Sequence, residues 1–221
     1  MIKLSNIAFQ YPQSDFKLSI DELQIEEGKK TAIIGPSGFG KTTLLNLLAG
    51  IFQPDKGEIL FDDKALNTLN DKQRRNFRIS TIGFVFQDFR LIPYLNVLDN
   101  VLLPYRINDT LKITSECTAL ANELAKKLGI SDKMKKFPDK LSQGERQRVA
   151  ICRALIHQPK VILADEPTGN LDPENKRKIM NNLFDYVNEK DATLITVTHD
   201  YDMLEGFDKV IDFTNFKSGT S

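Results

Sequence analysis

This chain of 221 residues has few cysteines, no excess of charge of either sign and no long apolar run. Its two cysteines, Cys117 and Cys152, are far apart and form no C-x-x-C pair, which argues against a disulfide framework and against a zinc site. Lysine plus arginine and aspartate plus glutamate both number 30, so the net charge is zero. We therefore expect no nucleic-acid partner.

The sequence also offers nothing that would cross a membrane. No apolar run approaches the roughly 18 residues that a membrane helix needs, and the longest, LLNLLAGIF, is short and contains Asn46. The first residues, MIKLSNIAFQYP, lack the apolar core of a signal peptide. We expect a cytoplasmic chain, and any membrane role requires another chain to supply the membrane part.

Apolar residues follow strand and helix periods in turn along most of the chain. Alternation predicts half-buried strands over 2–11 and 17–25, and short apolar runs predict further strands over 30–34, 58–62, 81–87, 160–165 and 192–198. Helical spacing predicts helices over 41–52, 115–128, 145–156 and 173–188. Leu44, Leu45, Leu47, Leu48 and Ile51 would form the buried face of the first helix. Strands alternating with helices imply an α/β fold with a mostly parallel sheet covered on both faces.

A glycine-rich loop, GPSGFGKT (35–42), matches G-x-x-x-x-G-K-[ST] and lies between a predicted strand and a predicted helix. Glycines allow the backbone N–H groups to surround a polyphosphate, and the helix N-terminus adds partial positive charge. Lys41 would bridge the β- and γ-phosphates of ATP, and the Thr42 hydroxyl would bind Mg²⁺. A chance glycine-rich turn, the alternative, would not need this flanking context. The predicted ATP-binding residues here are Gly35, Pro36, Ser37, Gly38, Phe39, Gly40, Lys41, Thr42 and Thr43.

The stretch VILADEP (161–167) is the expected companion of that loop. Its buried strand would deliver Asp165 to the carboxyl end of the sheet, where open α/β sheets bind ligands. Asp165 could hold the Mg²⁺ shell, and Glu166 could orient and deprotonate the attacking water. Taken alone, the two acids could equally be a favourable start to the next loop or helix.

The stretch LSQGERQRVA (141–150) has a serine, a glycine and a glutamate but no partner for catalysis. Ser142 and Glu145 form S-x-x-E, which would cap the following helix without any further function. Capping does not explain Gly144, since glycine in a first helical turn costs about 1 kcal/mol relative to alanine. A glycine is understandable there if a ligand must approach the backbone closely.

LSQGERQR resembles the signature motif of the ATP-binding cassette (ABC) ATPases. Further motifs that resemble those of the family occur before and after it, in the family's order, over essentially the whole chain. The resemblance implies a P-loop NTPase (RecA-like) core with a mostly parallel sheet, an N-terminal antiparallel β subdomain and an inserted α-helical subdomain. It implies one ABC ATPase domain over 1–221, divided into 1–87 (β subdomain and start of the core), 88–158 (helical subdomain with the signature) and 159–221 (rest of the core).

The same resemblance assigns a role to each of these motifs. Tyr11 would stack on adenine, although strands favour tyrosine anyway. Gln87 would reach Mg²⁺ and the attacking water, and His199 of TVTHD would contact the γ-phosphate, although a lone histidine is usually structural. Ser142, Gly144, Glu145 and Asp172 of GNLD would contact the ATP held by a second copy of the chain, so two copies would enclose two ATP molecules head to tail. Asp172 is also a sound helix N-cap before Pro173.

The stretch TIGFVFQDFRLIPYLNVLDNVLLP (81–104), together with ADEPTGNLD, looks most like the LolD/MacB group of ATPase subunits, which serve lipoprotein release or macrolide and peptide export. The resemblance implies a separate membrane permease that contacts Phe89–Tyr94 and holds the chain on the inner face of the membrane. The side chains expected there are Phe89, Leu91, Ile92 and Tyr94, although some of them could only pack the helical insertion. A regulator of cell-wall enzymes like FtsE, which transports nothing, is the alternative, and a soluble nucleic-acid ATPase is a third possibility.

Two positions depart from the family pattern. Gln143 stands where the signature usually has a glycine and would place a side chain beside the partner's ATP. Phe39 occupies a phosphate-loop position that is often small or polar, where it should be tolerated because that loop works through backbone N–H groups. Both bear on the tightness of the ATP-bound dimer and on the rate of hydrolysis.

Overall fold

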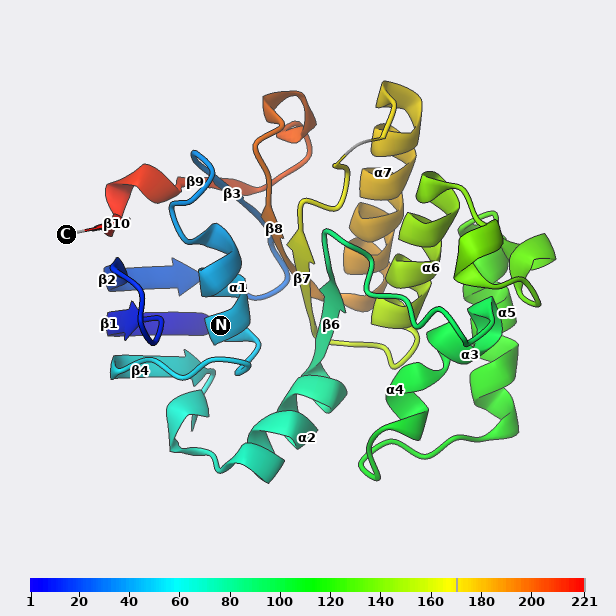
Figure 1. The fold of residues 1–221 in the computed structure, drawn as a ribbon, viewed down its shortest axis with the longest axis horizontal. Coiled ribbons are helices and arrows are strands. Elements are labelled where there is room, and N and C mark those ends of the chain that lie inside the picture. Colours follow the sequence, from blue (N-terminus) through cyan, green and yellow to red (C-terminus); the bar gives the residue numbers. More distant parts are fainter. Residues whose placement is uncertain (170, 221) are drawn as a thin grey trace.

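The structure is a computed structural model of the protein, and it describes residues 1–169 and 171–220. These residues form two five-stranded sheets with helices between and beside them (Figure 1). The α/β fold predicted from the sequence is confirmed, including the antiparallel N-terminal sheet and the helical insertion. No helix in the described part of the chain is long and apolar enough to span a membrane.

The first sheet is antiparallel and has the strand order β10-β2-β1-β4-β5. Its strands are β1 (Ile2–Gln10), β2 (Phe16–Ile25), β4 (Lys56–Phe61), β5 (Lys64–Ala65) and β10 (Lys217–Thr220). β1 lies at its centre and pairs with β2 from Ile2↔Ile25 to Gln10↔Lys17. β10 comes from the far end of the chain and pairs with the first half of β2, so the N- and C-terminal segments share this sheet.

The second sheet is parallel throughout and has the strand order β6-β7-β8-β3-β9. Its strands are β3 (Lys30–Ile34), β6 (Ile82–Val85), β7 (Val161–Asp165), β8 (Thr193–Val197) and β9 (Lys209–Asp212). β7 and β8 are buried along their whole length. Because all strands run the same way, the loops that follow them emerge at one edge of the sheet.

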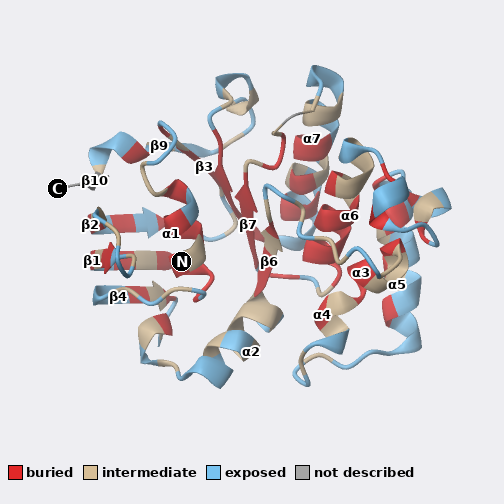
Figure 2. Cartoon of the chain, in the orientation of Figure 1, coloured by how far each residue is buried: buried red, intermediate tan, exposed pale blue. Residues whose placement is uncertain are grey.

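Helix α1 (Lys41–Leu48) lies between the two sheets, and its leucines are fully buried there (Figures 1 and 2). The opposite face of the parallel sheet is covered by α6 (Gln143–Leu155) and α7 (Pro173–Lys190). Alternate side chains of β7 point to opposite faces of the sheet and so join the two different cores. Val161 and Leu163 join the core around α1, whereas Ile162 and Ala164 join the core around α6 and α7.

Residues 88–158, all of which the structure describes, contain helices and no strand. The helices are α3 (Val97–Val101), α4 (Leu103–Arg106), α5 (Ser115–Lys127) and α6, with short 3-10 turns at Ser131–Lys133 and Pro138–Lys140. α5 ends at its C-cap Leu128, and Gly129 follows with a φ of 66°, the left-handed conformation typical of a glycine that ends a helix.

Several sequence predictions need correction. Ile51 is not part of the buried face of α1, because the left-handed Gly50 ends that helix and leaves Ile51 40% exposed. β6 stops at Val85 rather than at Gln87, since the chain turns at Phe86. α7 continues two residues beyond Asn188, to the left-handed Asp191. Six elements were not predicted from the sequence: α2 (Asp71–Thr81), α3, α4, β5, β9 and β10.

Candidate functional site

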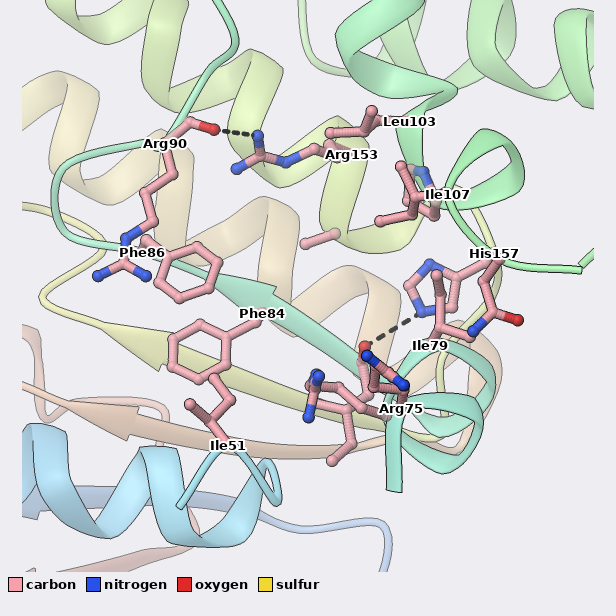
Figure 3. Close-up of a pocket in the computed structure, with 15 residues that line it drawn as sticks. Ile51, Arg75, Ile79, Phe84, Phe86, Arg90, Leu103, Ile107, Arg153 and His157 are labelled. Atoms are coloured by element: carbon pink, nitrogen blue, oxygen red, sulfur yellow. Dashed lines mark hydrogen bonds between the residues drawn. The ribbon is translucent and has the colours of Figure 1, made fainter. Parts of the chain in front are cut away.

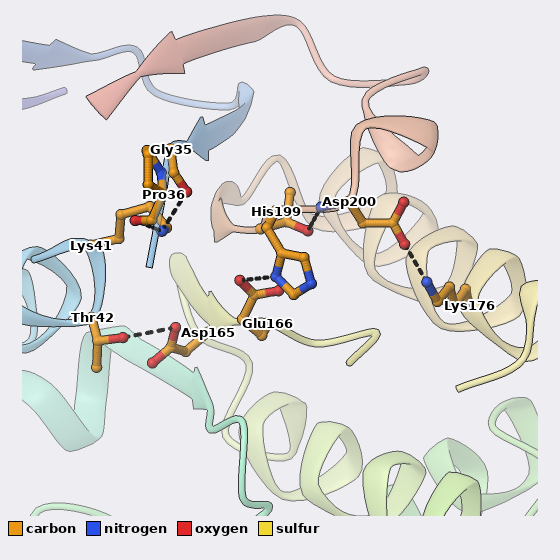
Figure 4. Close-up of polar contacts among 10 residues, drawn as sticks. Gly35, Pro36, Lys41, Thr42, Asp165, Glu166, Lys176, His199 and Asp200 are labelled. Atoms are coloured by element: carbon orange, nitrogen blue, oxygen red, sulfur yellow. Dashed lines mark hydrogen bonds and ion pairs between the residues drawn. The ribbon is translucent and has the colours of Figure 1, made fainter. Parts of the chain in front are cut away.

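The loop GPSGFGKT joins the end of β3 to the start of α1 (Figure 4). Its glycines Gly35, Gly38 and Gly40 all have positive φ values. Gly40 is the N-cap of α1 with a φ of 92°, and a Cβ placed on it would lie 2.6 Å from Cζ of Phe16. A side chain at 40 is therefore excluded both by the backbone conformation and by the ring of Phe16.

Lys41 of this loop is buried, and its ammonium group points back into the loop. Its Nζ donates hydrogen bonds to the carbonyl oxygens of Gly35 at 2.7 Å and Pro36 at 2.8 Å. Burial lowers the pKa of Lys41, while the nearby carboxylates of Glu166 and Asp165 oppose that shift. The loop thus already holds a cation at its centre, where phosphate oxygens could replace the two carbonyls as acceptors.

Thr42, Gln87 and Asp165 come together around one cavity of about 500 Å³. The Thr42 hydroxyl donates to Oδ1 of Asp165 at 3.2 Å. Asp165 is buried at the end of β7, and this burial raises the pKa of its carboxyl group, an effect that the Thr42 hydrogen bond partly offsets. The three side chains predicted to share a metal ion therefore do line a common space, and each offers an oxygen donor.

Glu166 and His199 form a contact beside that cavity (Figure 4). Nδ1 of His199 lies 2.8 Å from Oε1 of Glu166, although the residues follow different strands, β7 and β8. Glu166 has a left-handed backbone with a φ of 47°, which is unfavourable for a side chain of this kind and is often found at functional sites. The Glu166 side chain is 11% exposed and that of His199 is 67% exposed, so the histidine covers the carboxylate.

Lys176 of α7 forms an ion pair with Asp200, which follows His199 directly. Asp200 is fixed further by a hydrogen bond from its backbone N–H to the Thr198 hydroxyl at 3.0 Å. The segment that carries His199 is therefore tied to the helix that begins at Asp172. No local pattern predicts this ion pair, because the two residues lie 24 positions apart along the chain.

Tyr11 follows β1 and lies next to the phosphate loop. Its hydroxyl lies 2.8 Å from Oγ1 of Thr43, and its ring packs edge-on against Phe9 and Phe52. Phe39 of the loop is half-buried and packs against the core beneath the antiparallel sheet. The aromatic groups at this end of the site are thus anchored to the core, and Tyr11 stands within reach of the helix that follows the loop.

The signature stretch forms the N-terminus of α6. The Ser142 backbone N–H donates to Glu145 at 2.8 Å and the Glu145 N–H donates to the Ser142 hydroxyl at 3.3 Å, which completes the predicted capping box. The first of these bonds, together with the ion pair to Lys133, lowers the pKa of Glu145. A Cβ on Gly144 would meet only Arg148 at 3.5 Å and Leu171 at 3.8 Å. Nothing in the described chain therefore requires a glycine at 144.

Asp172 is the N-cap of α7, as predicted, and accepts from the Asn175 backbone N–H at 3.1 Å. The side-chain amide of Asn175 also donates to it, and this hydrogen bond is the main cause of a lowered pKa. Asn170 of the same GNLD motif lies outside the described residues. Within the rest of the chain, the hydrogen bonds and ion pairs of Ser142, Glu145 and Asp172 do not include any residue of the phosphate loop.

Gln143, unlike Ser142, Glu145 and Asp172, lies close to the predicted nucleotide cavity of its own chain. It is the first residue of α6, it is exposed, and it lines the same cavity as Thr42, Gln87 and Asp165 of its own chain. The sequence reading placed Gln143 beside the ATP of a second copy only. The structure adds a position for it at the edge of its own cavity.

A second concave surface lies between β6, α2, α4 and α6 (Figure 3). This groove has a volume of about 330 Å³, and its apolar lining includes the exposed side chains Ile51 and Ile107. Its basic lining residues are Arg75, Arg78, Arg90, Arg153 and His157. No acidic residue lines the groove among those that the structure describes, so it combines apolar surface with positive charge.

The predicted contact segment Phe89–Tyr94 only partly belongs to this groove. Arg90 lines it, but Phe89 lines the cavity beside Thr42, and Leu91 packs against the core of the helical region. Tyr94 is 78% exposed and is not among the residues that line the groove. A concave surface next to this segment is therefore formed in part by α2 and α4, neither of which was predicted from the sequence.

Two buried polar residues that the sequence reading missed hold the chain after Gln87 in place. Asn100 of α3 is fully buried and accepts from the Ile92 N–H at 2.7 Å, while its amide donates to three carbonyls of residues 92–96. Arg153 of α6 donates to the carbonyls of Phe89 and Arg90. For Arg153, its place in a predicted helix with an apolar face was the only available signal, and Asn100 lies in a segment for which no helix was predicted.

The chain is similar to known proteins over a region that includes these site residues. A family model described as ABC transporter matches residues 18–169. Among curated relatives, the lipoprotein-releasing system ATP-binding protein LolD 1 of Rhodopirellula baltica is 42% identical over 202 residues, which cover 90% of this chain and 87% of the relative. LolD of Saccharophagus degradans is 41% identical over 203 residues, which cover 90% of this chain and 88% of the relative.

The solved structures give an equally extensive match. A dimeric structure of a post-hydrolysis state of the ATP-binding cassette MJ0796, bound to ADP and Pi, superposes with a TM-score of 0.87 at 35% sequence identity. The match covers 96% of this chain and 95% of that chain. Sequence and structural similarity therefore extend over nearly all of both chains.

The groove histidine His157 should make stability depend on pH. Its Nε2 donates to the Ile82 carbonyl at 3.2 Å, but burial lowers the pKa of the ring from 6.5 to about 4. Between these values the unfolded chain binds a proton that the folded chain does not, so the contribution is fully present above the unfolded pKa and is lost as the pH falls. We expect His157→Gln, which can still donate to Ile82, to reduce this slope by up to about 1.4 kcal/mol per pH unit.

Urea unfolding of the wild type and the variant between neutral and acidic pH measures this slope. An acid dependence that is the same in both proteins would show that His157 titrates normally in the folded chain.

Proposed function

The chain belongs to the ABC transporter family, and on that premise we propose that it is the ATP-hydrolysing subunit of a membrane transport system of the LolD/MacB type. The observation that carries this proposal is the meeting of Thr42, Gln87 and Asp165 around one cavity next to Lys41. That arrangement supplies a phosphate cradle, a set of oxygen donors and a water-activating carboxylate within one edge of the sheet.

In this proposal the phosphate loop holds ATP within its own chain. The backbone N–H groups of Gly38, Gly40 and their neighbours surround the phosphates, and the N-terminus of α1 adds partial positive charge. Lys41 exchanges its two carbonyl acceptors for oxygens of the β- and γ-phosphates. Tyr11, which reaches the helix at Thr43, supplies an aromatic surface for adenine.

The residues around the cavity also fit a magnesium ion. Thr42, Gln87 and Asp165 offer a hydroxyl, an amide oxygen and a carboxylate, which are the hard oxygen donors that Mg²⁺ accepts. In the described chain no cluster of three or more histidine, cysteine, aspartate or glutamate residues could bind a metal, so phosphate oxygens and water would complete the shell. When bound, the ion would neutralise charge on the β- and γ-phosphates.

Glu166 would accept a proton from the attacking water, and His199 would hold its carboxylate in place. The 2.8 Å contact between Nδ1 and Oε1 fixes one carboxylate oxygen and leaves the other available to the water. The exposed His199 ring can at the same time reach the γ-phosphate from the end of β8.

A second copy of the chain would complete the site. Ser142, Gly144, Glu145 and Asp172 lie at two helix N-termini, which favour an anion, and their contacts do not include the phosphate loop of their own chain. The space beside Gly144 admits an approaching phosphate. We propose a head-to-tail homodimer in which each signature helix faces the ATP of the other copy.

The membrane partner would bind in the groove between α2, α4 and α6. Its apolar lining and its arginines fit an amphipathic segment that carries acidic residues, and Tyr94 would add a contact at the edge. The proposed chain is one cassette, with 88–158 as the helical part that the partner moves against the core. Through this partner the protein would lie on the inner face of the cell membrane.

Replacing Glu166 tests the hydrolytic centre. Glu166→Gln keeps the size and the His199 contact but removes the basic carboxylate, so turnover should fall by roughly 100- to 10,000-fold while ATP binding remains. The variant should then accumulate as an ATP-bound dimer, seen by light scattering with and without ATP. Glu189→Gln is the control, since Glu189 pairs only with the exposed Lys127. Full turnover in Glu166→Gln would exclude Glu166 as the base.

Gly144→Ala should have opposite effects on the stability of the fold and on ATP turnover. The added methyl group meets only ordinary contacts in the chain, and alanine is the better helix former, so the free energy of unfolding should rise by about 1 kcal/mol. In the dimer the same methyl group would stand between the helix terminus and the partner's ATP. Turnover should therefore fall at least about tenfold, a loss of roughly 1.4 kcal/mol of transition-state stabilisation. A stable variant with unchanged turnover would show that nothing approaches Gly144.

Site-specific photo-crosslinking in cells tests the membrane partner. A crosslinker at Ile107, which lines the groove and is 65% exposed, should capture an integral membrane protein through its cytoplasmic segment. A crosslinker at Tyr201, which is 64% exposed but lies outside the groove, is the matched control. Cargo export or lipoprotein release that depends on the captured protein would support the LolD/MacB type. A captured protein that controls cell-wall enzymes and moves no cargo would favour the FtsE-like alternative.

A further inference from the structure

The backbone immediately after Gln87 is held in an unfavourable conformation. Phe89 and Arg90 are consecutive non-glycine residues with left-handed φ values of 61° and 45°. Each costs of the order of 1 kcal/mol or more, and such pairs persist only where the surrounding structure imposes them. The cause of this conformation should therefore be visible among the neighbours of these two residues.

Arg153 of the signature helix supplies that constraint (Figure 3). Its Nη1 donates to the carbonyl of Arg90 and its Nη2 donates to the carbonyl of Phe89, both at 2.5 Å. The planar guanidinium thus binds two successive carbonyls, which turn toward the same side because both residues are left-handed. A lysine, with one ammonium group, could not reproduce this fork.

The cost of burying the Arg153 charge indicates that this side chain does more than fill space in the core. It is only 8% exposed, it forms no ion pair within the described chain, and burial lowers its pKa to about 10. A buried cation without a directly paired carboxylate is expensive to maintain, and here the two carbonyl dipoles and the more distant charge of Asp88 offset that cost. An apolar residue would fill the same space on α6 more cheaply, so the guanidinium is best explained by the loop that it holds.

The segment held in this way separates the nucleotide cavity from the groove. Phe84, Phe86 and Arg90 line both spaces. They form a stack, with the Phe84 and Phe86 ring centroids 4.1 Å apart and the Arg90 guanidinium 4.4 Å from the Phe86 centroid. Gln87 follows this stack directly and faces the cavity, while Arg153 lies behind it and lines the groove.

We infer that Arg153 is a positioning residue for ATP hydrolysis: by holding the carbonyls of Phe89 and Arg90, it sets the place of Gln87 in the nucleotide cavity. This inference rests on the proposed function of that cavity. Arg153 contacts no reacting atom and acts through Gln87 alone. Because it lines the groove and belongs to the signature helix, it also connects both of these surfaces to the same glutamine.

Asn100 does not provide the same constraint. It binds residues 92, 95 and 96, and therefore fixes the later part of the loop from α3. Loss of Arg153 would leave that anchor intact and release only the segment between Gln87 and Leu91. The change expected is thus a misplaced Gln87 in a folded protein.

A double-mutant cycle between Arg153 and Gln87 tests this inference, with the full-length chain and MgATP. We expect Arg153→Met to lower kcat about tenfold when Gln87 is present, but less than about twofold in a Gln87→Ala background. The Mg²⁺ concentration for half-maximal turnover should rise in Arg153→Met as it does in Gln87→Ala, whereas KM for ATP should change little. Arg153→Lys, which retains the charge and one donor, should lie between the wild type and Arg153→Met.

Arg146→Met is the matched control, because Arg146 is on the same helix and also donates to a backbone carbonyl, that of Pro138 at 2.9 Å. Its effect should be the same factor with and without Gln87. Urea unfolding of every variant identifies losses due to misfolding, and Arg153→Lys carries the test if Arg153→Met is not folded.

The outcomes distinguish the two proposals. Equal factors for the Arg153 variants in both backgrounds, in an active wild type, would overturn the positioning role and leave the proposed function standing. A folded wild type with no ATP turnover would overturn the proposed function, and the positioning role with it.

Discussion

Parallel pairing of β6, β7, β8 and β3 is the constraint on which the whole site depends. Each of these neighbouring strands ends at the same edge, and each delivers one part of the site there: Gln87 after β6, Asp165 and Glu166 at the end of β7, His199 after β8 and the phosphate loop after β3. The Thr42–Asp165 and Glu166–His199 contacts join groups that are 123 and 33 residues apart in sequence. A change in register at any of these pairs would separate groups that act together.

The sequence allowed this edge to be predicted because its components carry local signals. Apolar runs define the central strands, the glycine pattern defines the phosphate loop, and Asp172 before Pro173 defines a helix start. α2 was missed because Phe77 and Ile79 are its only apolar residues, which is too few to show a helical period, and because none of its residues is fully buried. Its Asn70–Gln73 capping box was the one available signal. β9 and β10 are short strands whose pairing depends on distant partners, which no local pattern reveals.

The contacts that shape the site beyond its motifs were not predictable for a similar reason. Arg153 occurs in a helix whose apolar periodicity is otherwise regular, and Asn100 occurs in the five-residue helix α3, which was not predicted. Only the folded chain shows that they bind a loop more than fifty and eight residues away, respectively. The signature stretch shows the opposite case. Its serine and glutamate are fully explained by the helix that they cap, and its glycine is not explained by anything in the described chain. One short motif thus combines a requirement of folding with a requirement that lies outside the monomer.

The stack of Phe84, Phe86 and Arg90 has a thermodynamic consequence, because it is a single partition with a ligand space on each side. Because these side chains line both spaces, a ligand that displaces one of them in one space also changes the lining of the other. Occupancy of the two spaces is then linked, and linkage is reciprocal: the factor by which a nucleotide changes affinity for a ligand in the groove equals the factor by which that ligand changes affinity for the nucleotide. Neither side of the partition is inherently the input, and which of them acts as the effector is decided by the order in which the two are filled.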